Sequence, residues 1–326
     1  MTSRFTFYFE FMKTLVFFQK ICFLFCLAAC SLSVNAQTVF ISNEAELKAI
    51  SNDLSANYRL INDIILTEEW TPIGKDKPFS GVLEGNHFVI RNLKINGGTG
   101  NVGFFAQTYG AFIQDLGFEN VEIIAADATN VGAIIGFSTA SYIENSYVSN
   151  ALIEGNNVGS MIGLSKSRGI NPTVISNSYA VADIKSGTAA GGIVAIAEGG
   201  TGAADGAAIE KVYFCGSVEA KTLCGGIVAS TKGKNTVSDC LVVLSSELEG
   251  QATDPIVAKK GDNALQMSNN YFEKEGVLKD YAKNTPLSDT NVKSADFYKK
   301  RLYWEADKWN IRDGFYPLVS WQKAEE

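Results

Sequence analysis

Residues 143–148 read I-E-N-S-Y-V, and residues 175–180 read I-S-N-S-Y-A. The same six-residue pattern begins at seven places, namely Ile90, Ile113, Ile143, Ile175, Ile209, Val237 and Met267. Successive starts are 23, 30, 32, 34, 28 and 30 residues apart. Position one is aliphatic or Met, position three is Asn or Asp in all repeats except at Lys211, and positions four and six are mostly apolar. A repeat of about 30 residues indicates a solenoid, a propeller or a related array.

A second landmark recurs in phase with the first. It reads V-G-F-F from Val102, V-G-A-I from Val131, V-G-S-M from Val158, A-G-G-I from Ala190 and C-G-G-I from Cys224. Glycine-rich clusters between the landmarks would break helices, and apolar runs of five or six residues have the length of strands. We therefore predict an all-β fold, a single-stranded right-handed parallel β-helix (solenoid) with short helical or irregular caps at both ends. A β-propeller is the alternative, although it needs four strands per unit and slightly longer units.

Stacked coils lie about 4.8 Å apart, so the same motif position recurs directly above itself. At position three this stacking predicts a structural ladder in which polar side chains bond to the coils above and below. We expect Asn145 and Asn177, in adjacent repeats, to bond to each other's coil. The predicted ladder comprises Asn92, Asp115, Asn145, Asn177, Asp239 and Asn269.

The repeats divide the chain into a cap at 37–78, the parallel β-helix at 79–272 and a second cap at 273–326, because an open stack needs its ends covered. Residues 43–54 predict an amphipathic helix with Asn43 as its N-cap and Leu47, Ile50 and Leu54 on one side. Residues 295–309 predict a second, aromatic-rich helix, after which residues 311–321 would lie across the last coil.

Residues 1–36 have the organisation of a signal peptide, with Lys13 and Lys20 preceding a short apolar run at 21–29. Two cleavage sites remain open. The sequence from Leu27 to Cys30 resembles a lipobox, which would place a lipid on Cys30, whereas Val34 and Ala36 suit cleavage by signal peptidase I before Gln37. We therefore expect export, either as a lipoprotein of the outer membrane or cell surface or as a periplasmic or secreted protein.

The composition excludes several classes of function. The 326 residues carry 28 basic and 35 acidic side chains, so the net charge of −7 argues against nucleic acid and anionic lipid as partners. We expect contact with a membrane only through the possible N-terminal lipid, and a monomer. His87 is the single histidine, which excludes an H-E-x-x-H zinc site. We expect neither a metal nor a cofactor.

Three cysteines follow the leader, Cys215, Cys224 and Cys240, and no C-x-x-C occurs among them. Buried thiols that pack as small apolar side chains are the favoured interpretation, ahead of a disulfide or a metal site.

The stretch from Phe79 to Leu93 (F-S-G-V-L-E-G-N-H-F-V-I-R-N-L), followed by the recurring V-G and I-x-N-x-Y motifs, resembles the GLUG-repeat proteins. These are bacterial exported β-helix proteins, often labelled adhesin-like or found beside proteolytic domains. The resemblance covers nearly all of the chain after the leader, and it implies a binding protein at the cell surface. This chain departs from the family pattern at His87, which falls on a glycine position, and at Phe88, which falls on a histidine position.

The fifth motif position alternates with the apolar fourth and sixth, so its side chains should face outward. Tyr147, Tyr179 and Tyr213 would then form a column along three consecutive coils. The column either stacks to shield the sheet or serves as a platform for sugar rings. The ligand implied by the second interpretation is an extracellular glycan or protein.

Polysaccharide lyases and hydrolases on the same fold are the enzymatic alternative. An inverting glycosidase needs two carboxylates about 6.5–9.5 Å apart, and the pectinase-type motifs (Asp-Asp, G-H-G and R-I-K) are absent from the sequence. The candidate carboxylate pairs, Glu144 with Asp115 and Asp183 with Glu219, are better interpreted as charges that face solvent. Lys211 and Arg91 could supply a lyase base but lack an adjacent carboxylate cluster in the sequence. We therefore expect a non-enzymatic protein that binds glycan or protein ligands, with a purely architectural subunit of a surface assembly as the further alternative.

Overall fold

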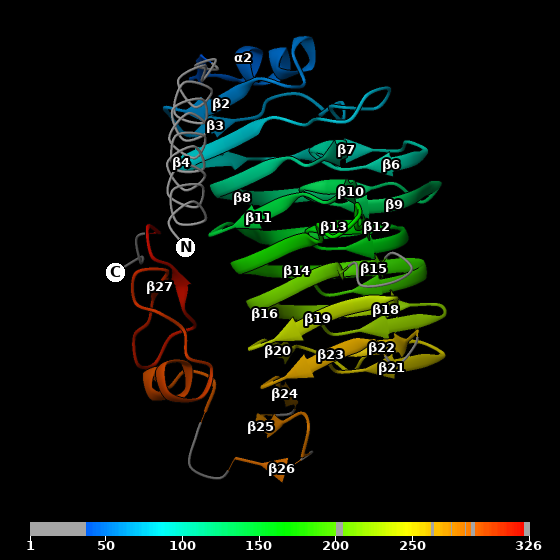
Figure 1. The fold of residues 1–326 in the computed structure, drawn as a ribbon, viewed down its shortest axis with the longest axis vertical. Coiled ribbons are helices and arrows are strands. Elements are labelled where there is room, and N and C mark those ends of the chain that lie inside the picture. Colours follow the sequence, from blue (N-terminus) through cyan, green and yellow to red (C-terminus); the bar gives the residue numbers. More distant parts are fainter. Residues whose placement is uncertain are drawn as a thin grey trace, which may run out of the picture. The chain divides into compact units, whose positions relative to one another are not determined.

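The computed structural model describes residues 37–199, 205–261, 264–274, 276–283, 285–287 and 291–322. Of these, Thr38 onwards belong to one compact unit built of stacked parallel coils (Figure 1). The fold is nearly all β, with 59% of residues in strands and 6% in helices, and it forms a β-solenoid of about seven turns. The predicted class is confirmed. A propeller is excluded because each long strand pairs in parallel with its counterpart in the next repeat.

Three sheets make up the unit. In the N-terminal half, the twenty-stranded sheet contains β1 (Thr38–Ile41), β2 (Asn57–Leu60), β3 (Ile64–Ile65), β4 (Val82–Arg91), β5 (Lys94–Asn96), β6 (Gly100–Val102), β8 (Phe112–Ile124), β9 (Ala128–Gly132), β11 (Tyr142–Glu144) and β12 (Tyr147–Gly159). In the C-terminal half it contains β14 (Thr173–Gly191), β16 (Asp205–Ala220), β17 (Leu223–Gly225), β19 (Lys234–Ser238), β20 (Leu241–Leu244), β21 (Ala252–Asp254), β23 (Leu265–Ser268), β24 (Tyr271–Lys274), β25 (Val277–Asp280) and β26 (Thr285–Pro286). A six-stranded sheet, named here the lateral sheet, contains β7 (Phe105–Tyr109), β10 (Ile135–Thr139), β13 (Ile162–Lys166), β15 (Val194–Glu198), β18 (Val228–Lys232) and β22 (Val257–Lys260). The third sheet pairs β27 (Trp309–Asn310) with β28 (Leu318–Val319).

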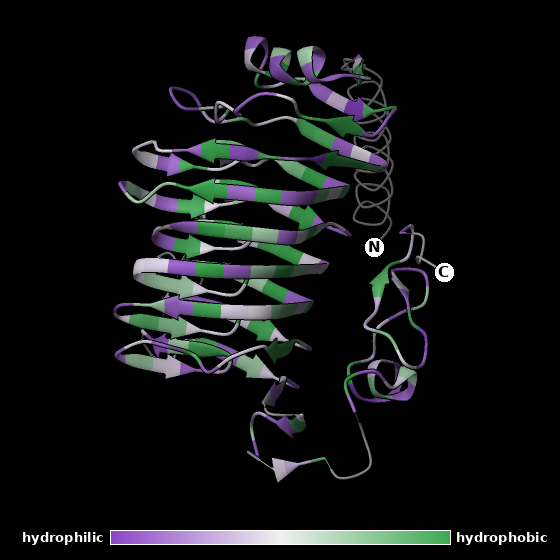
Figure 2. Ribbon diagram, turned by 180° about the vertical axis from the view of Figure 1, so that it is seen from behind, coloured by the Kyte–Doolittle hydropathy of each residue, from purple (hydrophilic) through white to green (hydrophobic). Residues whose placement is uncertain are grey.

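Columns of aliphatic side chains fill the inside of the coils. Hydrophobic and hydrophilic residues alternate along many strands, as the colouring in Figure 2 shows, so one face of each strand is turned inward. The first motif position is fully buried from coil to coil, at Leu83, Ile113, Ile143, Ile175, Ile209 and Val237. The glycine of the V-G landmark lets the backbone fold closely. A Cβ atom at Gly191 would lie 1.9 Å from the carbonyl oxygen of Val194.

The first repeat begins at Leu83 and not, as the sequence pattern suggested, at Ile90. Leu83 pairs with Ile113, whereas Ile90 pairs with Phe118. The corrected first interval is 30 residues, from 83 to 113, in place of the aberrant 23. The motif around Ile90 resembles the others because the next face of the same coil has a similar alternation of apolar and polar residues.

The N-terminal cap is a short helix over the first coil. Helix α2 (Glu44–Lys48) begins at Asn43, whose side chain accepts a hydrogen bond from the backbone N–H of Glu46 at 3.0 Å. It continues as the 3-10 turn η1 (Ala49–Asn52), so the predicted helix is shorter than 43–54. Parallel pairing already begins with β1 and β2. The β-stack therefore starts before residue 79, because Ile41 and Leu60 are buried in the same core.

The C-terminal part differs from the expected cap in two ways. The end of the stack is followed by the antiparallel pairing of β24, β25 and β26. Residues 291–322, named here the C-terminal segment, then run back along the side of the coils instead of across the last coil (Figure 1). The helix predicted at 295–309 is reduced to a single irregular turn with the π-helix η2 (Phe297–Arg301), and Tyr303 just beyond it has a left-handed backbone with φ of +54°.

Candidate binding faces

Tyr147, Tyr179 and Tyr213, named here the tyrosine column, stand on the outer side of consecutive coils as the alternation predicted. Their rings are stacked and nearly parallel. The centroids of Tyr147 and Tyr179 are 5.1 Å apart at an interplanar angle of 4°, and those of Tyr179 and Tyr213 are 4.8 Å apart at 2°. Gly117 occupies the same column one coil earlier, and a Cβ atom there would lie 2.6 Å from the Tyr147 ring. The absence of a side chain at Gly117 makes room for that ring.

The tyrosine column is not exposed, so of the two interpretations left open by the sequence, the stacked column that shields the sheet fits this conformation and the open platform does not. The three residues are 1%, 3% and 2% exposed. The C-terminal segment covers them with Trp304, Trp309, Tyr316 and Trp321, whose ring centroids lie 5.5–6.3 Å from those of Tyr147 or Tyr213. Contacts between residues more than 90 positions apart in the chain thus turn an outer face into a second hydrophobic core.

Hydrogen bonds fix each hydroxyl of the tyrosine column. Tyr147 donates to a carboxylate oxygen of Glu119 at 2.6 Å, Tyr179 to the side-chain oxygen of Gln322 at 2.7 Å, and Tyr213 to the carbonyl of Pro317 at 2.9 Å. Burial raises the phenol pKa of all three tyrosines. The geometry is that of a sealed structural contact, and no face of the column is left for a sugar in this conformation.

All six residues of the predicted ladder have the same left-handed backbone conformation, but only two pairs of them are joined by hydrogen bonds. Their φ angles, together with that of Lys211, lie between +47° and +63°. Two pairs are linked as the ladder requires, with Asn145 donating to Asp115 at 2.5 Å and Asn269 donating to Asp239 at 2.6 Å. The expected bond between Asn145 and Asn177 is absent, and the side-chain oxygens of both residues are buried without a partner among the described residues. Asn and Asp recur here because they tolerate the left-handed region that this corner demands.

Asn92 belongs to a different column from the other five residues, because Ile90 lies on the next face of its coil. Its side-chain oxygen accepts a hydrogen bond from Asn120 at 3.3 Å, and Asn120 accepts one from Asn150 at 2.8 Å. A second amide ladder joins Asn101, Asn130 and Asn157 at 2.8 and 3.1 Å. Sequence reasoning missed both ladders, although asparagines 27–30 residues apart were their signal.

Phe112 and Tyr142, named here the aromatic pair, form an exposed aromatic feature on the side of the stack. They occupy one column of adjacent coils, with ring centroids 4.6 Å apart and an interplanar angle of 1°. Phe112 is 45% exposed and Tyr142 is half-buried. The flanking coils carry only Val82 and Val174 in this column, so each ring keeps one face that no described aromatic ring covers. The sequence signal for the pair was an aromatic residue directly before Ile113 and Ile143.

Polar side chains lie beside the aromatic pair on the same outward face, two residues further along each strand. They are Glu84, Gln114, Glu144 and Ser176, in register from coil to coil. Arg59 forms an ion pair with Glu84 at 2.7 Å, and Lys308 forms one with Glu144 at 2.8 Å that raises the lysine pKa. Rings beside amide, carboxylate and hydroxyl groups can bind a sugar, because a pyranose has an apolar face of C–H groups and a rim of hydroxyls.

The carboxylates considered for catalysis are each engaged or isolated. Glu144 is ion-paired with Lys308, and Asp115 accepts the hydrogen bond from Asn145. Asp183 accepts a hydrogen bond from Ser217, one coil away in the same column, and Glu219 lies in another column, opposite Lys185. Of the candidate lyase bases, Lys211 pairs with Glu305, and Arg91 pairs with Asp63 at 2.7 Å and Glu119 at 2.8 Å. Glu219 also lines an open groove of about 510 Å³, together with Lys185 and Glu249.

The cysteines are separate thiols. Cys224 and Cys240 are buried, and burial raises their pKa values to about 12, while Cys215 is half-buried with a raised pKa. In the part of the chain that the structure describes, no group of three or more His, Cys, Asp or Glu side chains could hold a metal ion.

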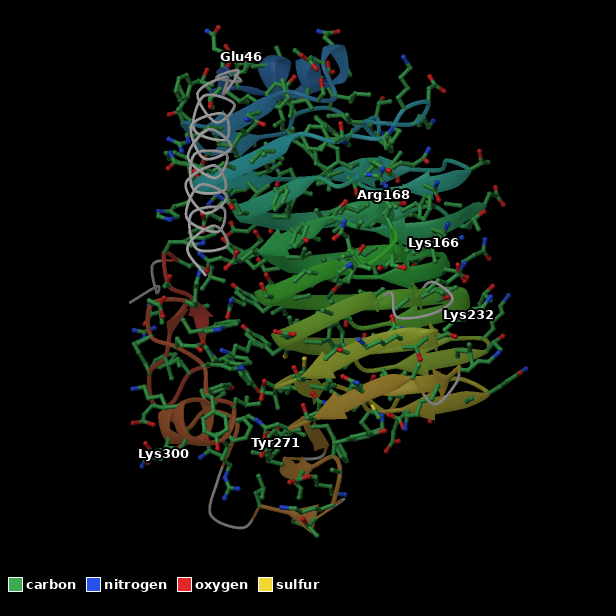
Figure 3. All side chains as sticks on the ribbon, in the orientation of Figure 1. Glu46, Lys166, Arg168, Lys232, Tyr271 and Lys300 are labelled. Atoms are coloured by element: carbon green, nitrogen blue, oxygen red, sulfur yellow. The ribbon has the colours of Figure 1, made fainter. Side chains whose placement is uncertain are left out.

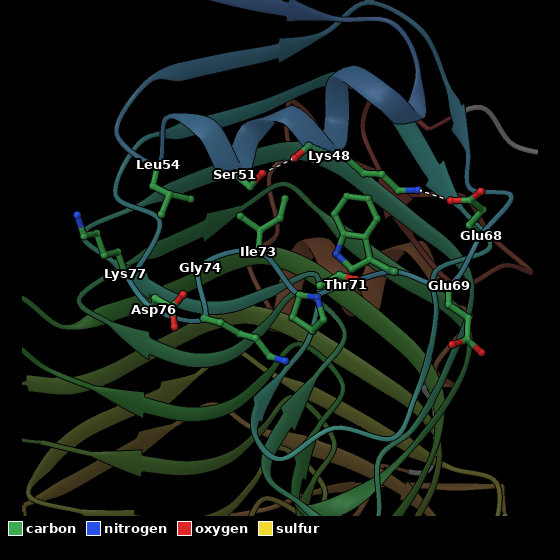
Figure 4. Close-up of a pocket in the computed structure, with 13 residues that line it drawn as sticks. Lys48, Ser51, Leu54, Glu68, Glu69, Thr71, Ile73, Gly74, Asp76 and Lys77 are labelled. Carbon is green, nitrogen blue, oxygen red and sulfur yellow. Dashed lines mark hydrogen bonds and ion pairs between the residues drawn. The ribbon is translucent and has the colours of Figure 1, made fainter.

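A groove of about 680 Å³ lies between the N-terminal cap and the loop at 67–77 (Figure 4). Its charged rim is already neutralised in part, since Lys48 contacts Glu44 and Glu68 at 2.9 Å each. Its aromatic member, Trp70, is buried and donates to the carbonyl of Phe104 at 3.0 Å. These contacts are more typical of a packed cap than of a binding site.

The fold and its faces define a class, a β-solenoid of stacked parallel coils with flat lateral surfaces. The sequence matches no family model and no curated protein. Among solved structures it is similar to the crystal structure of "a putative immunoglobulin A1 protease from Bacteroides ovatus". That similarity has a TM-score of 0.51 at 17% sequence identity and covers 89% of this chain and 94% of the other. It supports the fold and leaves the GLUG family a resemblance in sequence motifs.

The predicted signal peptide and Cys30 lie outside the described residues. Within the described part, no helix has the length and apolar character needed to cross a bilayer.

Proposed function

We propose that the chain is an exported, non-catalytic β-helix protein that binds a linear glycan on its lateral surface, with the aromatic pair as the contact site. One observation carries the proposal. Phe112 and Tyr142 are stacked and solvent-accessible on a flat face of the solenoid. Exposed aromatic side chains that pack on no core are uncommon on a stable surface, and they mark binding sites when they cluster.

The surroundings of the aromatic pair suit a sugar. Each ring is bordered in its column by a valine, whose side chain is shorter than the ring, so the outer part of that ring face can contact a pyranose. Among the described residues, no group bonds to the Tyr142 hydroxyl, so that hydroxyl is available to a sugar hydroxyl. Gln114 and Ser176 add further donors and acceptors beside the rings.

Two further observations favour binding over hydrolysis. Glu144, the carboxylate nearest the aromatic pair in sequence, is held by Lys308. A general acid must reach the glycosidic oxygen, and the ion pair holds the Glu144 carboxylate on Lys308 instead. The tyrosine column, the other candidate platform, is sealed by the C-terminal segment.

A glycan array and a polysaccharide panel test the proposal. We expect purified protein to bind at least one linear glycan without releasing reducing ends. The Phe112→Ala/Tyr142→Ala double variant should lose that signal. Release of soluble oligosaccharide would overturn the non-catalytic part, and absence of binding across both panels would favour an architectural subunit.

A further inference from the structure

The outer face of the lateral sheet carries a row of positive charge in an otherwise acidic protein. Lys166, Arg168, Lys232 and Lys259, named here the cationic row, are all exposed at one margin of this sheet or in the loop that follows it. Lys166, Glu198 and Lys232 share one register column, and Arg168 and Lys259 lie beside it, so these five side chains together carry +3 where the chain as a whole has −7. Figure 3 shows Lys166, Arg168 and Lys232 on the side of the stack away from the C-terminal segment.

An apolar stripe runs beside the cationic row. Phe137, Leu164 and Ile196 are stacked in register on β10, β13 and β15, and all three are half-buried. Gln107 precedes the stripe, and Ser230 and Lys259 follow it. The stripe therefore ends in polar residues on both sides, so that it is a bounded surface and not part of a larger interface.

Of the four cations, Lys166 alone has an ion-pair partner among the described residues. Lys166 lies 3.0 Å from Glu198 and 5.8 Å from the Phe137 ring, and Arg168 lies 4.6 Å from the centroid of the Tyr109 ring. Aromatic rings orient a cation without neutralising it. Lys232 and Lys259 form no ion pair with any described residue.

The distance between the lysines of the cationic row fits an extended polymer. Lys166 and Lys232 occupy the same column two coils apart, which corresponds to about 9.6 Å. That distance is close to the length of a disaccharide, so both lysines can meet acidic groups on alternate sugars of one extended chain. Lys259, one coil beyond Lys232, lies two residues away from that column, opposite Ser230 at the end of the apolar stripe.

We infer that this face of the lateral sheet binds an acidic linear polysaccharide, with the cationic row contacting its carboxylate groups and the apolar stripe contacting its C–H faces. This site is separate from the aromatic pair and does not depend on it. The cationic row gives the protein a preference for acidic glycans, which the uncharged aromatic pair cannot give.

Polygalacturonate is the probe, with dextran as the neutral polymer, in affinity electrophoresis of the purified protein. We expect retardation by polygalacturonate that weakens as salt rises, because screening reduces the attraction between exposed charges. Lys166→Gln/Lys232→Gln should weaken binding by about tenfold, whereas Glu198→Gln should strengthen it several-fold. Lys221→Gln, which removes one positive charge at an exposed lysine outside the lateral sheet, should leave binding unchanged.

Three outcomes would overturn this inference. They are no retardation at low salt, an equal loss in Lys221→Gln and the lateral-sheet variant, and tighter binding of polyglutamate than of polygalacturonate. The last result would assign the face to acidic peptides. Failure of the aromatic-pair proposal remains separable, because Phe112→Ala should leave polygalacturonate binding intact.

Discussion

At the scale of single residues, the left-handed corner explains the sequence better than the amide ladder does. The third-position residue has a positive φ in all six repeats from Ile113 onwards, including Lys211, which keeps the conformation without the preferred side chain. The sequence pattern therefore located the corner correctly, but it could not distinguish a requirement of the backbone from one of hydrogen bonding. Both requirements favour Asn, and only the coordinates show that Asn145 and Asn177 do not bond to each other.

Replacing Lys211 tests this explanation directly. Lys211→Asn should raise the free energy of unfolding by about 0.5–1 kcal/mol, because Asn adopts positive φ at lower cost than Lys. The comparison belongs in a Glu305→Gln background, where the ion pair of Lys211 no longer contributes. Asn145→Leu should lower the same quantity by about 1–3 kcal/mol, through strain and the lost bond to Asp115. Chemical denaturation measures both, and a destabilising Lys211→Asn would contradict the role of the corner.

The buried tyrosine hydroxyls limit the stability of the fold at alkaline pH. Burial raises the pKa of Tyr147, Tyr179 and Tyr213, whereas phenols in the unfolded chain ionise at about pH 10. The neutral forms thus stabilise the fold fully below that pH. As pH rises above it, loss of protons lowers the free energy of the unfolded state, by about 1.4 kcal/mol per tyrosine at pH 11.

We therefore expect the free energy of unfolding to fall steeply between pH 10 and pH 11. Tyr213→Phe should make the fall shallower, whereas Tyr303→Phe, at a residue 65% exposed, should not. Urea titrations at a series of pH values measure the slope. A flat profile would show that the column is open to solvent in solution.

At the scale of elements, the C-terminal segment is the part that sequence reasoning placed wrongly. Its aromatic content was visible, but a contact such as that of Trp321 with Tyr147 joins residues 174 positions apart. Periodicity reports which side chains share a face, and it carries no information about what covers that face. The repeats themselves were predictable because the same motif recurs in each coil and marks the residues that pair with the adjacent coils. The misplaced start at Ile90 shows the weakness of a short motif when the spacing is ignored.

Two substitutions within the C-terminal segment measure what it contributes. Trp309 is 1% exposed and stacks on Trp304 with a centroid distance of 4.2 Å, so Trp309→Ala should cost about 3–5 kcal/mol. Phe315, 54% exposed in the same segment, is the matched control and should change stability by less than about 0.5 kcal/mol. Thermal unfolding followed by near-ultraviolet circular dichroism compares the two. Equal shifts would mean that the segment does not pack on the tyrosine column in solution.

At the scale of the whole molecule, export is a prediction that stands on residues 1–36. Mature protein from its native host should begin at Cys30, with a lipid, or at Gln37. In the first case Cys30→Ala should move the protein from the membrane fraction to the soluble fraction, and in the second it should change nothing. N-terminal sequencing and mass spectrometry decide between the two, and an unprocessed cytoplasmic chain would contradict both.

The lateral surface is where the fold and the proposed function meet. A solenoid repeats one outward position at every coil, so a single aromatic or charged column becomes a linear site without further elements. The sequence identified the outward positions, yet it favoured Tyr147, Tyr179 and Tyr213, the column that the chain's own C-terminal segment covers. The aromatic pair escaped notice because Phe112 and Tyr142 directly precede the six-residue motif.

The affinity of the protein for a glycan, measured with and without the two rings of the aromatic pair, decides whether this pair is a glycan-binding site. Isothermal titration with the strongest array ligand should show at least a tenfold loss, about 1.4 kcal/mol, in both Phe112→Ala and Tyr142→Ala. Phe315→Ala, at another exposed aromatic residue, should bind as the wild type does. The melting temperatures of all three variants should stay close to that of the wild type, because these side chains are partly exposed. Wild-type affinity in Phe112→Ala and Tyr142→Ala would contradict a glycan site at the aromatic pair.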